Sequence, residues 1–143
     1  MKKVLVIVMI LLTFSCSKDE NRNDNNPNLI NPLVSLNLNL NLPQYNALNF
    51  AGNSIIINQQ GIKGIVVYNV NNEIYTAFEL SDPNHLPSEC SRMMIDGIVA
   101  KCPCQSDDNE YNIVTGKHRS QPNFYPMQQY FTERTGDNLR INN

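Results

Sequence analysis

The chain has 143 residues and a formal net charge of −2, and only 17% of its residues are charged. This length suffices for a single domain after a leader and a linker. The slightly acidic balance excludes the basic face by which nucleic-acid-binding proteins contact phosphates, so we expect no nucleic-acid partner.

The first 16 residues predict an export signal. Lys2 and Lys3 precede an apolar run over residues 4–12, which is too short to span a bilayer and fits the core of a signal peptide. The run leads to Thr13-Phe14-Ser15-Cys16. A small residue directly before a cysteine resembles a bacterial lipobox, in which Cys16 is lipidated and becomes the first residue. The alternative is an ordinary signal peptide with an incidental cysteine.

The stretch after Cys16 indicates where the protein resides and how it is tethered. Ser17-Lys18-Asp19-Glu20 resembles the surface-export signal of Bacteroidota lipoproteins, whereas the alternative is a solvated linker start. We expect an outer-membrane lipoprotein exposed at the cell surface, with the periplasmic face as the alternative, held to the membrane by its lipid. Because residues 16–32 are polar and rich in Asn and Asp, they predict a flexible tether between a signal peptide over 1–15 and a domain over 33–143.

From residue 33 onward the pattern predicts an all-β domain. Leu and Asn alternate strictly over residues 36–42, which is typical of a half-buried strand. We expect the further strands at 54–58, 62–68, 74–80, 93–95, 98–100, 111–115, 126–134 and 138–141. Residues 69–72, Asp96-Gly97 and Thr135-Gly136-Asp137 predict hairpin turns, and the Asp-Gly pair predicts type I′. No helical periodicity follows the leader, so we expect a small antiparallel β-sandwich or barrel.

The stretch Cys102-Pro103-Cys104-Gln105, together with residues 81–85 and Cys90, resembles the two cluster-binding loops of Rieske iron–sulfur domains. The similarity extends from about residue 34 to the end and is most specific over 77–131. Its further matching positions are Tyr111-Asn112, Gly116, Gln121-Pro122, Pro126-Met127 and Tyr130. The resemblance implies a β domain of Rieske type in which the two loops face each other.

The ligand positions depart from the family pattern. A Rieske [2Fe–2S] cluster is held by two thiolates and two imidazoles. Cys102 matches one thiolate, but Asp82, Asn84 and Gln105 stand at the other three positions. We therefore expect a degenerate site without a cluster or other cofactor. The alternative is a [2Fe–2S] electron-transfer protein with unusual ligation.

The resemblance also implies a disulfide between the loops, from Cys90 to Cys104, which leaves Cys102 as an odd thiol. Pairing of Cys90 with Cys102 is the alternative. A disulfide agrees with export from the reducing cytosol. Use of Cys102 and Cys104 as a redox couple would make the protein an exported thiol–disulfide protein, which is a third hypothesis.

Two histidines and an acidic run complete the candidate residues. His85 lies one position beyond the family's histidine and, with Asp82 and Cys102, has the ligand types of a mononuclear zinc-like site. A loop histidine is the preferred interpretation, so no metal is predicted. His118 and the run Asp107-Asp108, with Glu110, are predicted to be solvated.

These observations favour a binding or structural module rather than an enzyme. No catalytic triad pattern, phosphate-binding loop or zincin motif is present in the sequence. We expect two partners, the membrane through the lipid on Cys16 and an envelope protein that the sequence does not identify.

Overall fold

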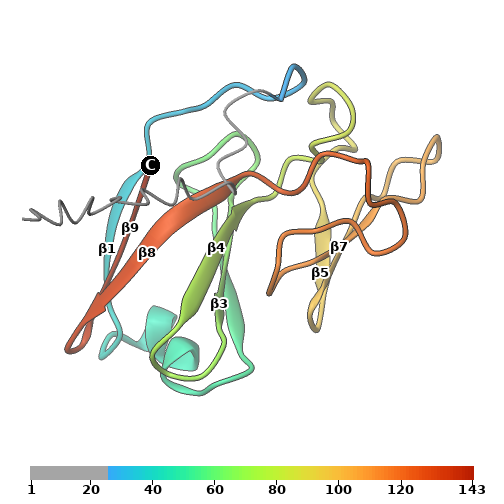
Figure 1. The fold of residues 1–143 in the computed structure, drawn as a ribbon. Coiled ribbons are helices and arrows are strands. Elements are labelled where there is room, and N and C mark those ends of the chain that lie inside the picture. Colours follow the sequence, from blue (N-terminus) through green and yellow to red (C-terminus); the bar gives the residue numbers. More distant parts are fainter. Residues whose placement is uncertain (1–25) are drawn as a thin grey trace, which may run out of the picture.

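The computed structural model describes residues 26–143, and its regular structure within this range is almost entirely β-strand (Figure 1). A six-stranded antiparallel sheet has the order β1-β9-β8-β4-β3-β2, and a three-stranded antiparallel sheet has the order β5-β6-β7. The predicted all-β antiparallel fold is therefore confirmed. The strands are β1 (Ser35–Asn39), β2 (Ser54–Ile57), β3 (Ile65–Asn69), β4 (Tyr75–Glu79), β5 (Met94–Asp96), β6 (Val99–Lys101), β7 (Glu110–Asn112), β8 (Gln129–Thr135) and β9 (Asn138–Asn142).

The alternating Leu–Asn segment forms β1, and its two faces differ as predicted. Leu38 is fully buried and lies opposite Leu139 of β9, whereas Asn37 and Asn39 are exposed. Successive side chains of a strand point to opposite faces, so one face enters the core and the other meets water. The strand ends at Asn39, three residues earlier than predicted.

The chain leaves β1 for a short 3₁₀ helix, η1 (Pro43–Asn49), which the sequence pattern did not predict. Pro43 begins this helix because its fixed φ suits a first helical turn. The helix buries Leu48 in the core of the large sheet. Among residues 26–143, no helix is long and apolar enough to cross a membrane.

Strands β3 and β4 are buried on both faces and connect two hydrophobic cores. Ile65, Val67 and Ala77 enter the core of the large sheet, whereas Val66 and Phe78 enter a second core beneath the small sheet. This arrangement explains why β3 begins with a continuous apolar run, from Ile65 to Val67, instead of alternating apolar and polar residues. The small sheet is therefore packed against the centre of the large one.

The small sheet supports the loops described below, and its first hairpin differs from the prediction. Asp96 pairs with Val99, so the turn residues are Gly97 and Ile98 rather than Asp96 and Gly97. Gly97 has φ +57°, and Ile98 has a negative φ. A positive φ at the first turn position alone is the pattern of type II′, whereas type I′ requires it at both.

The signal peptide, Cys16 and the first part of the predicted tether lie outside the described residues. Residues 26–32, the last part of the predicted tether, are hydrogen-bonded to the domain. The side-chain amides of Asn26 and Asn28 donate hydrogen bonds of 2.8 and 2.9 Å to the carbonyl oxygen of Pro83. Asn143 donates a further hydrogen bond of 2.6 Å to the Pro32 carbonyl.

A buried carboxylate closes the end of β4. Glu79 is inaccessible to solvent, and its oxygens accept hydrogen bonds from the backbone N–H groups of Ile62, Lys63 and Ser81 at 2.7–3.0 Å. The Tyr130 hydroxyl donates a fourth bond of 2.9 Å. A buried charge is tolerated when hydrogen bonds replace its hydration in this way. Glu79 thus fixes the loop before β3 and the start of the loop after β4.

Replacing Tyr130→Phe should lower the free energy of unfolding by roughly 1–2 kcal/mol at neutral pH, because Glu79 loses one of its donors. Burial and the Glu79 carboxylate raise the pKa of Tyr130 far above its ordinary value. The unfolded phenol ionises first as pH rises above about 10. The wild-type protein therefore loses stability above that pH, and the variant should lose less.

Urea unfolding monitored between pH 7 and 11 measures this difference. Tyr68→Phe is the matched control, since no hydrogen bond of the Tyr68 hydroxyl is found within residues 26–143. An equally steep alkaline decline in Tyr130→Phe and wild type would contradict the role assigned to the Tyr130–Glu79 contact.

Candidate functional site

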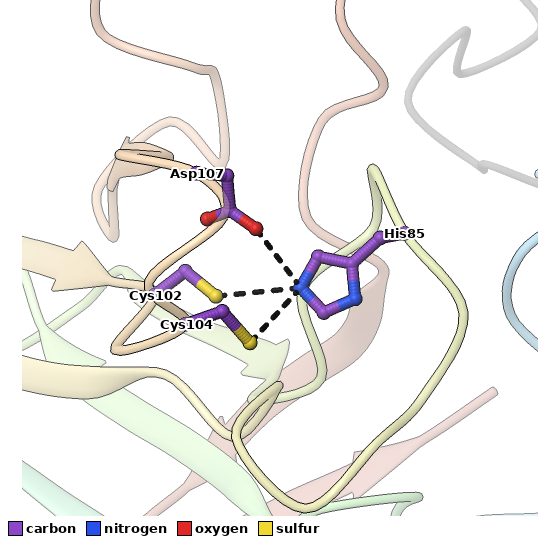
Figure 2. A group of neighbouring side chains, drawn as sticks. All are labelled: His85, Cys102, Cys104 and Asp107. Atoms are coloured by element: carbon purple, nitrogen blue, oxygen red, sulfur yellow. Dashed lines mark hydrogen bonds and ion pairs between the residues drawn. The ribbon is translucent and has the colours of Figure 1, made fainter.

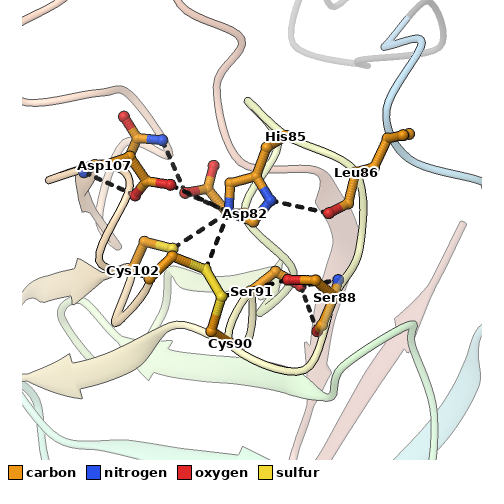
Figure 3. The surroundings of a disulfide bond; sticks show 10 residues. Asp82, His85, Leu86, Ser88, Cys90, Ser91, Cys102 and Asp107 are labelled. Carbon is orange, nitrogen blue, oxygen red and sulfur yellow. Dashed lines mark hydrogen bonds and ion pairs between the residues drawn. A yellow bond between two sulfur atoms is a disulfide. The ribbon is translucent and has the colours of Figure 1, made fainter.

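Two loops meet beside the small sheet. The first loop spans residues 80–93 between β4 and β5, and the second loop spans residues 102–109 between β6 and β7. A disulfide joins Cys90 of the first loop to Cys104 of the second, with an S–S distance of 2.09 Å (Figure 3). This is the pair that the family resemblance implied. Cys102 is a free, buried thiol in this structure, so the alternative partner of Cys90 is not used.

The environment of Cys102 suppresses its ionisation. Burial is the main cause that raises the pKa of its thiol to about 12, and the carboxylates of Asp82 and Asp107 act in the same direction. Reactive cysteines need a lowered pKa, because the thiolate is the nucleophile. The arrangement therefore does not favour Cys102 as half of a redox couple.

Asp82 links the two loops through its buried carboxylate. The Tyr111 hydroxyl donates a hydrogen bond of 2.7 Å to Oδ1, and the Asn109 amide donates one of 2.9 Å to Oδ2. The backbone N–H of Asn84 donates a third, of 2.8 Å, to Oδ1. Asp82 is inaccessible to solvent. Its carboxylate is therefore a structural acceptor that joins the first loop to β7 and to the residue preceding it.

Asn84 and Gln105, which the resemblance places at two further ligand positions, have different surroundings. The Asn84 amide donates hydrogen bonds of 2.8 Å to the Tyr111 hydroxyl and to the Tyr125 carbonyl. Its Oδ1 accepts a bond of 3.0 Å from the Tyr125 N–H. Gln105 is exposed in a turn of the second loop. The structure thus gathers Asp82, Asn84 and Cys102 in one network and leaves Gln105 at its margin.

His85 reaches across from the first loop to the second (Figure 2). Its Nε2 lies 3.4 Å from Cys102 Sγ, 3.6 Å from Cys104 Sγ and 3.4 Å from Asp107 Oδ2. The side chain is 26% exposed, so it lies at the edge of the buried network. His85, Cys102, Cys104 and Asp107 therefore form a cluster of potential metal ligands, with one atom of each within 4.8 Å of the others.

Asp107 and His118 are less exposed than the sequence analysis predicted. Asp107 turns inward toward His85, whereas the neighbouring Asp108 is exposed as predicted. His118 packs edge-to-face between Tyr111 and Phe124, with ring centroids 5.0 and 4.9 Å apart. Both residues lie in irregular segments, where spacing along the chain does not fix the direction of a side chain. The one sequence signal for the packing of His118 was Tyr111, an aromatic position that matches the family pattern.

Comparison with known proteins gives similarity of fold only. No protein-family model matches the chain, and neither does any curated protein. Among solved structures, the ferredoxin of Sphingomonas yanoikuyae B1 is 20% identical, with a TM-score of 0.45, over 66% of this chain and 88% of that one. A chain of the complex of reduced oxygenase and oxidized ferredoxin in carbazole 1,9a-dioxygenase is 24% identical, with a TM-score of 0.45, over 64% and 90%. Similarity at this level assigns no function.

Replacing Asp82→Ala should lower the free energy of unfolding by about 3 kcal/mol or more. Three donors lose their acceptor, and a buried donor without a partner costs roughly 1–3 kcal/mol. Thermal and urea unfolding of the variant measure the loss. Asp108→Ala is the matched control, because an exposed aspartate of the second loop should change stability by less than about 0.5 kcal/mol. Equal stability of the two variants would show that the Asp82 network does not hold the loops together.

Proposed function

We propose that this chain is an envelope-anchored lipoprotein whose Rieske-like β domain works without an iron–sulfur cluster, as a binding or structural module. The observation that carries the proposal is the environment of Asp82, where the family has a thiolate ligand. Its carboxylate is buried and accepts three hydrogen bonds from Tyr111, Asn109 and Asn84. A group used in this way serves the protein fold rather than an iron atom.

The donor set as a whole does not fit a Rieske cluster, which needs two thiolates and two imidazoles. Asn84 uses its side-chain amide and carbonyl on Tyr111 and Tyr125, and neither is an imidazole. Gln105 offers an amide from an exposed turn. Of the four positions, Cys102 alone carries the family's ligand type. The hydrogen-bond network stabilises the loops that the cluster would otherwise hold.

Location and partners follow from the N-terminal pattern. The proposed lipid on Cys16 anchors the chain to the outer membrane, and Ser17-Lys18-Asp19-Glu20 supports exposure at the cell surface. The domain then acts on an envelope protein rather than on nucleic acid, which agrees with a net charge of −2. The proposed role is non-catalytic.

An electron carrier with unusual ligation is the second candidate function. One observation favours it: His85 Nε2 lies 3.4 Å from Cys102 Sγ. An imidazole and a thiol therefore lie together, although His85 is one position beyond the family's histidine. Two further ligands would have to come from residues outside the family pattern.

Iron and acid-labile sulfide, measured together with the visible spectrum, separate the two candidates. The full chain is purified anaerobically in detergent from iron-replete cells. We expect a colourless protein with far less than the two irons per chain that a [2Fe–2S] cluster requires. Cys102→Ser is the matched control, and it should have the same trace iron content. Stoichiometric iron and sulfide that disappear in Cys102→Ser would instead establish the electron carrier.

Metabolic labelling with a fatty acid tests the anchor. Wild-type protein should incorporate label and remain with the membrane fraction, whereas Cys16→Ser should lose the label, since the Cys16 sulfur is the proposed attachment point of the lipid. Ser17→Ala is the matched neighbour and should be labelled like wild type. Unchanged labelling of Cys16→Ser would refute the proposed lipidation site.

A further inference from the structure

The ring nitrogen Nε2 of His85 is surrounded by oxygen and sulfur atoms. The Asp107 and Asp82 carboxylates approach it at 3.4 and 3.7 Å, and the sulfurs of Cys102 and Cys104 at 3.4 and 3.6 Å. The two carboxylate distances exceed the 2.7–3.2 Å of a good N–H···O hydrogen bond. A cation bound between Nε2, the two sulfurs and the Asp107 carboxylate would interact favourably with all four of these groups.

The other ring nitrogen sets the tautomer that metal binding needs. His85 Nδ1 lies 2.9 Å from the backbone carbonyl of Leu86, which can only accept, so Nδ1–H is the donor (Figure 3). In the neutral ring, the lone pair of Nε2 then points toward the sulfurs and carboxylates. Histidine ligands of metals are held by the same kind of bond, from the distal N–H to a carbonyl or carboxylate.

Three of the six distances within the cluster match the edges of a tetrahedron around zinc. Zinc binds cysteine sulfur at about 2.3 Å, histidine nitrogen at about 2.05 Å and carboxylate oxygen at about 2.1 Å, so the edges between its ligand atoms are roughly 3.3–3.8 Å. The three distances from Nε2 to Cys102, Cys104 and Asp107 are 3.4, 3.6 and 3.4 Å. Each matches such an edge, and all four ligand atoms lie within 4.8 Å of one another.

We propose that His85, Cys102, Cys104 and Asp107 form a zinc site that becomes complete when the Cys90–Cys104 disulfide is reduced. In the oxidised protein the Cys104 sulfur is bonded to Cys90, and thiolates rather than disulfide sulfurs bind metals. Three donors then remain. Reduction frees the Cys104 sulfur as the fourth donor, and this sulfur already lies beside the other three.

The reaction balances with a dithiol as reductant. The dithiol supplies two electrons and two protons, the S–S bond becomes the two thiols of Cys90 and Cys104, and the reductant becomes a cyclic disulfide. Zn²⁺ then displaces one proton each from Cys102 and Cys104. It bonds to both sulfurs, to Nε2 of His85 and to an oxygen of Asp107. Two thiolates favour Zn²⁺ over Mg²⁺ or Ca²⁺, which prefer oxygen ligands.

An open approach leads to the cluster. A surface depression of about 480 Å³ is lined by Asn84, His85, Asp107, Asp108, Asn109 and His118, among others. His85 and Asp107 are 26% and 20% exposed on this side, whereas Cys102 is buried behind them. A hydrated ion can therefore reach the nitrogen and oxygen ligands first and then the sulfurs.

Two cysteine variants of the full chain test the proposal. Cys90→Ser and Cys104→Ser remove the same disulfide, but only Cys90→Ser leaves Cys104 free to bind metal. Both are titrated with Co²⁺ and then Zn²⁺ under argon without thiols. We expect thiolate-to-cobalt charge-transfer absorption in Cys90→Ser, reversed by one equivalent of Zn²⁺. Cys104→Ser should bind Zn²⁺ at least about tenfold more weakly, since even outer partners of a metal site change affinity by that much.

Wild-type protein provides a measurement with no substitution. After reduction with dithiothreitol and its removal under argon, the affinity for Zn²⁺ should rise at least about tenfold over the oxidised protein. In the reduced protein, Asp107→Asn should weaken binding, whereas Asp108→Asn should not. Equal affinities of Cys90→Ser and Cys104→Ser, or of Asp107→Asn and Asp108→Asn, would overturn the proposal. The iron and sulfide content decides the absence of a cluster independently of this titration.

Discussion

The buried carboxylate of Asp82 is the constraint on which the arrangement of the two loops depends. An ionised group without water is stable only when donors surround it, and here the donors come from Tyr111, Asn109 and the backbone of Asn84. Each donor belongs to a segment that must therefore stay in place. The Cys90–Cys104 disulfide adds a covalent restraint between the same loops. The positions of His85 and Cys102 follow from these restraints, because both lie in the segments that Asp82 and the disulfide fix.

The two cores explain how a small sheet can present such a network. Strands β3 and β4 contribute side chains to both cores, so the small sheet packs on a layer that is itself fully buried. Gly116 allows close contact at this junction: it has φ +71°, and a Cβ there would lie 2.5 Å from Phe78. The small sheet is thereby held in a fixed position on the large sheet, and it supports the loops although they contain little regular structure. Because the two sheets form the framework, the sequence of the loops can change while the fold is retained.

Much of the fold was predictable because its causes are local. Alternation placed Leu38 in the core, and turn residues placed the hairpins, although the register of the turn at Gly97 depends on cross-strand pairing that composition does not encode. The disulfide followed from a family resemblance rather than from spacing. Asp107 and the ordered Asn26 could not be predicted, since their directions are set by His85 and Pro83, which are remote in sequence. The position of the site between the two loops was therefore predictable, but the complete set of residues that form it was not.

The contact of Asn26 with Pro83 has a consequence for the orientation of the domain at a membrane. Pro83 belongs to the first loop, so Asn26, the first described residue, lies beside this loop. Ten residue steps separate Asn26 from Cys16, a span of at most roughly 35 Å even when fully extended. With a lipid on Cys16, the loops would be confined to a narrow zone next to the bilayer. A partner that contacts the loops would then meet them close to the bilayer surface.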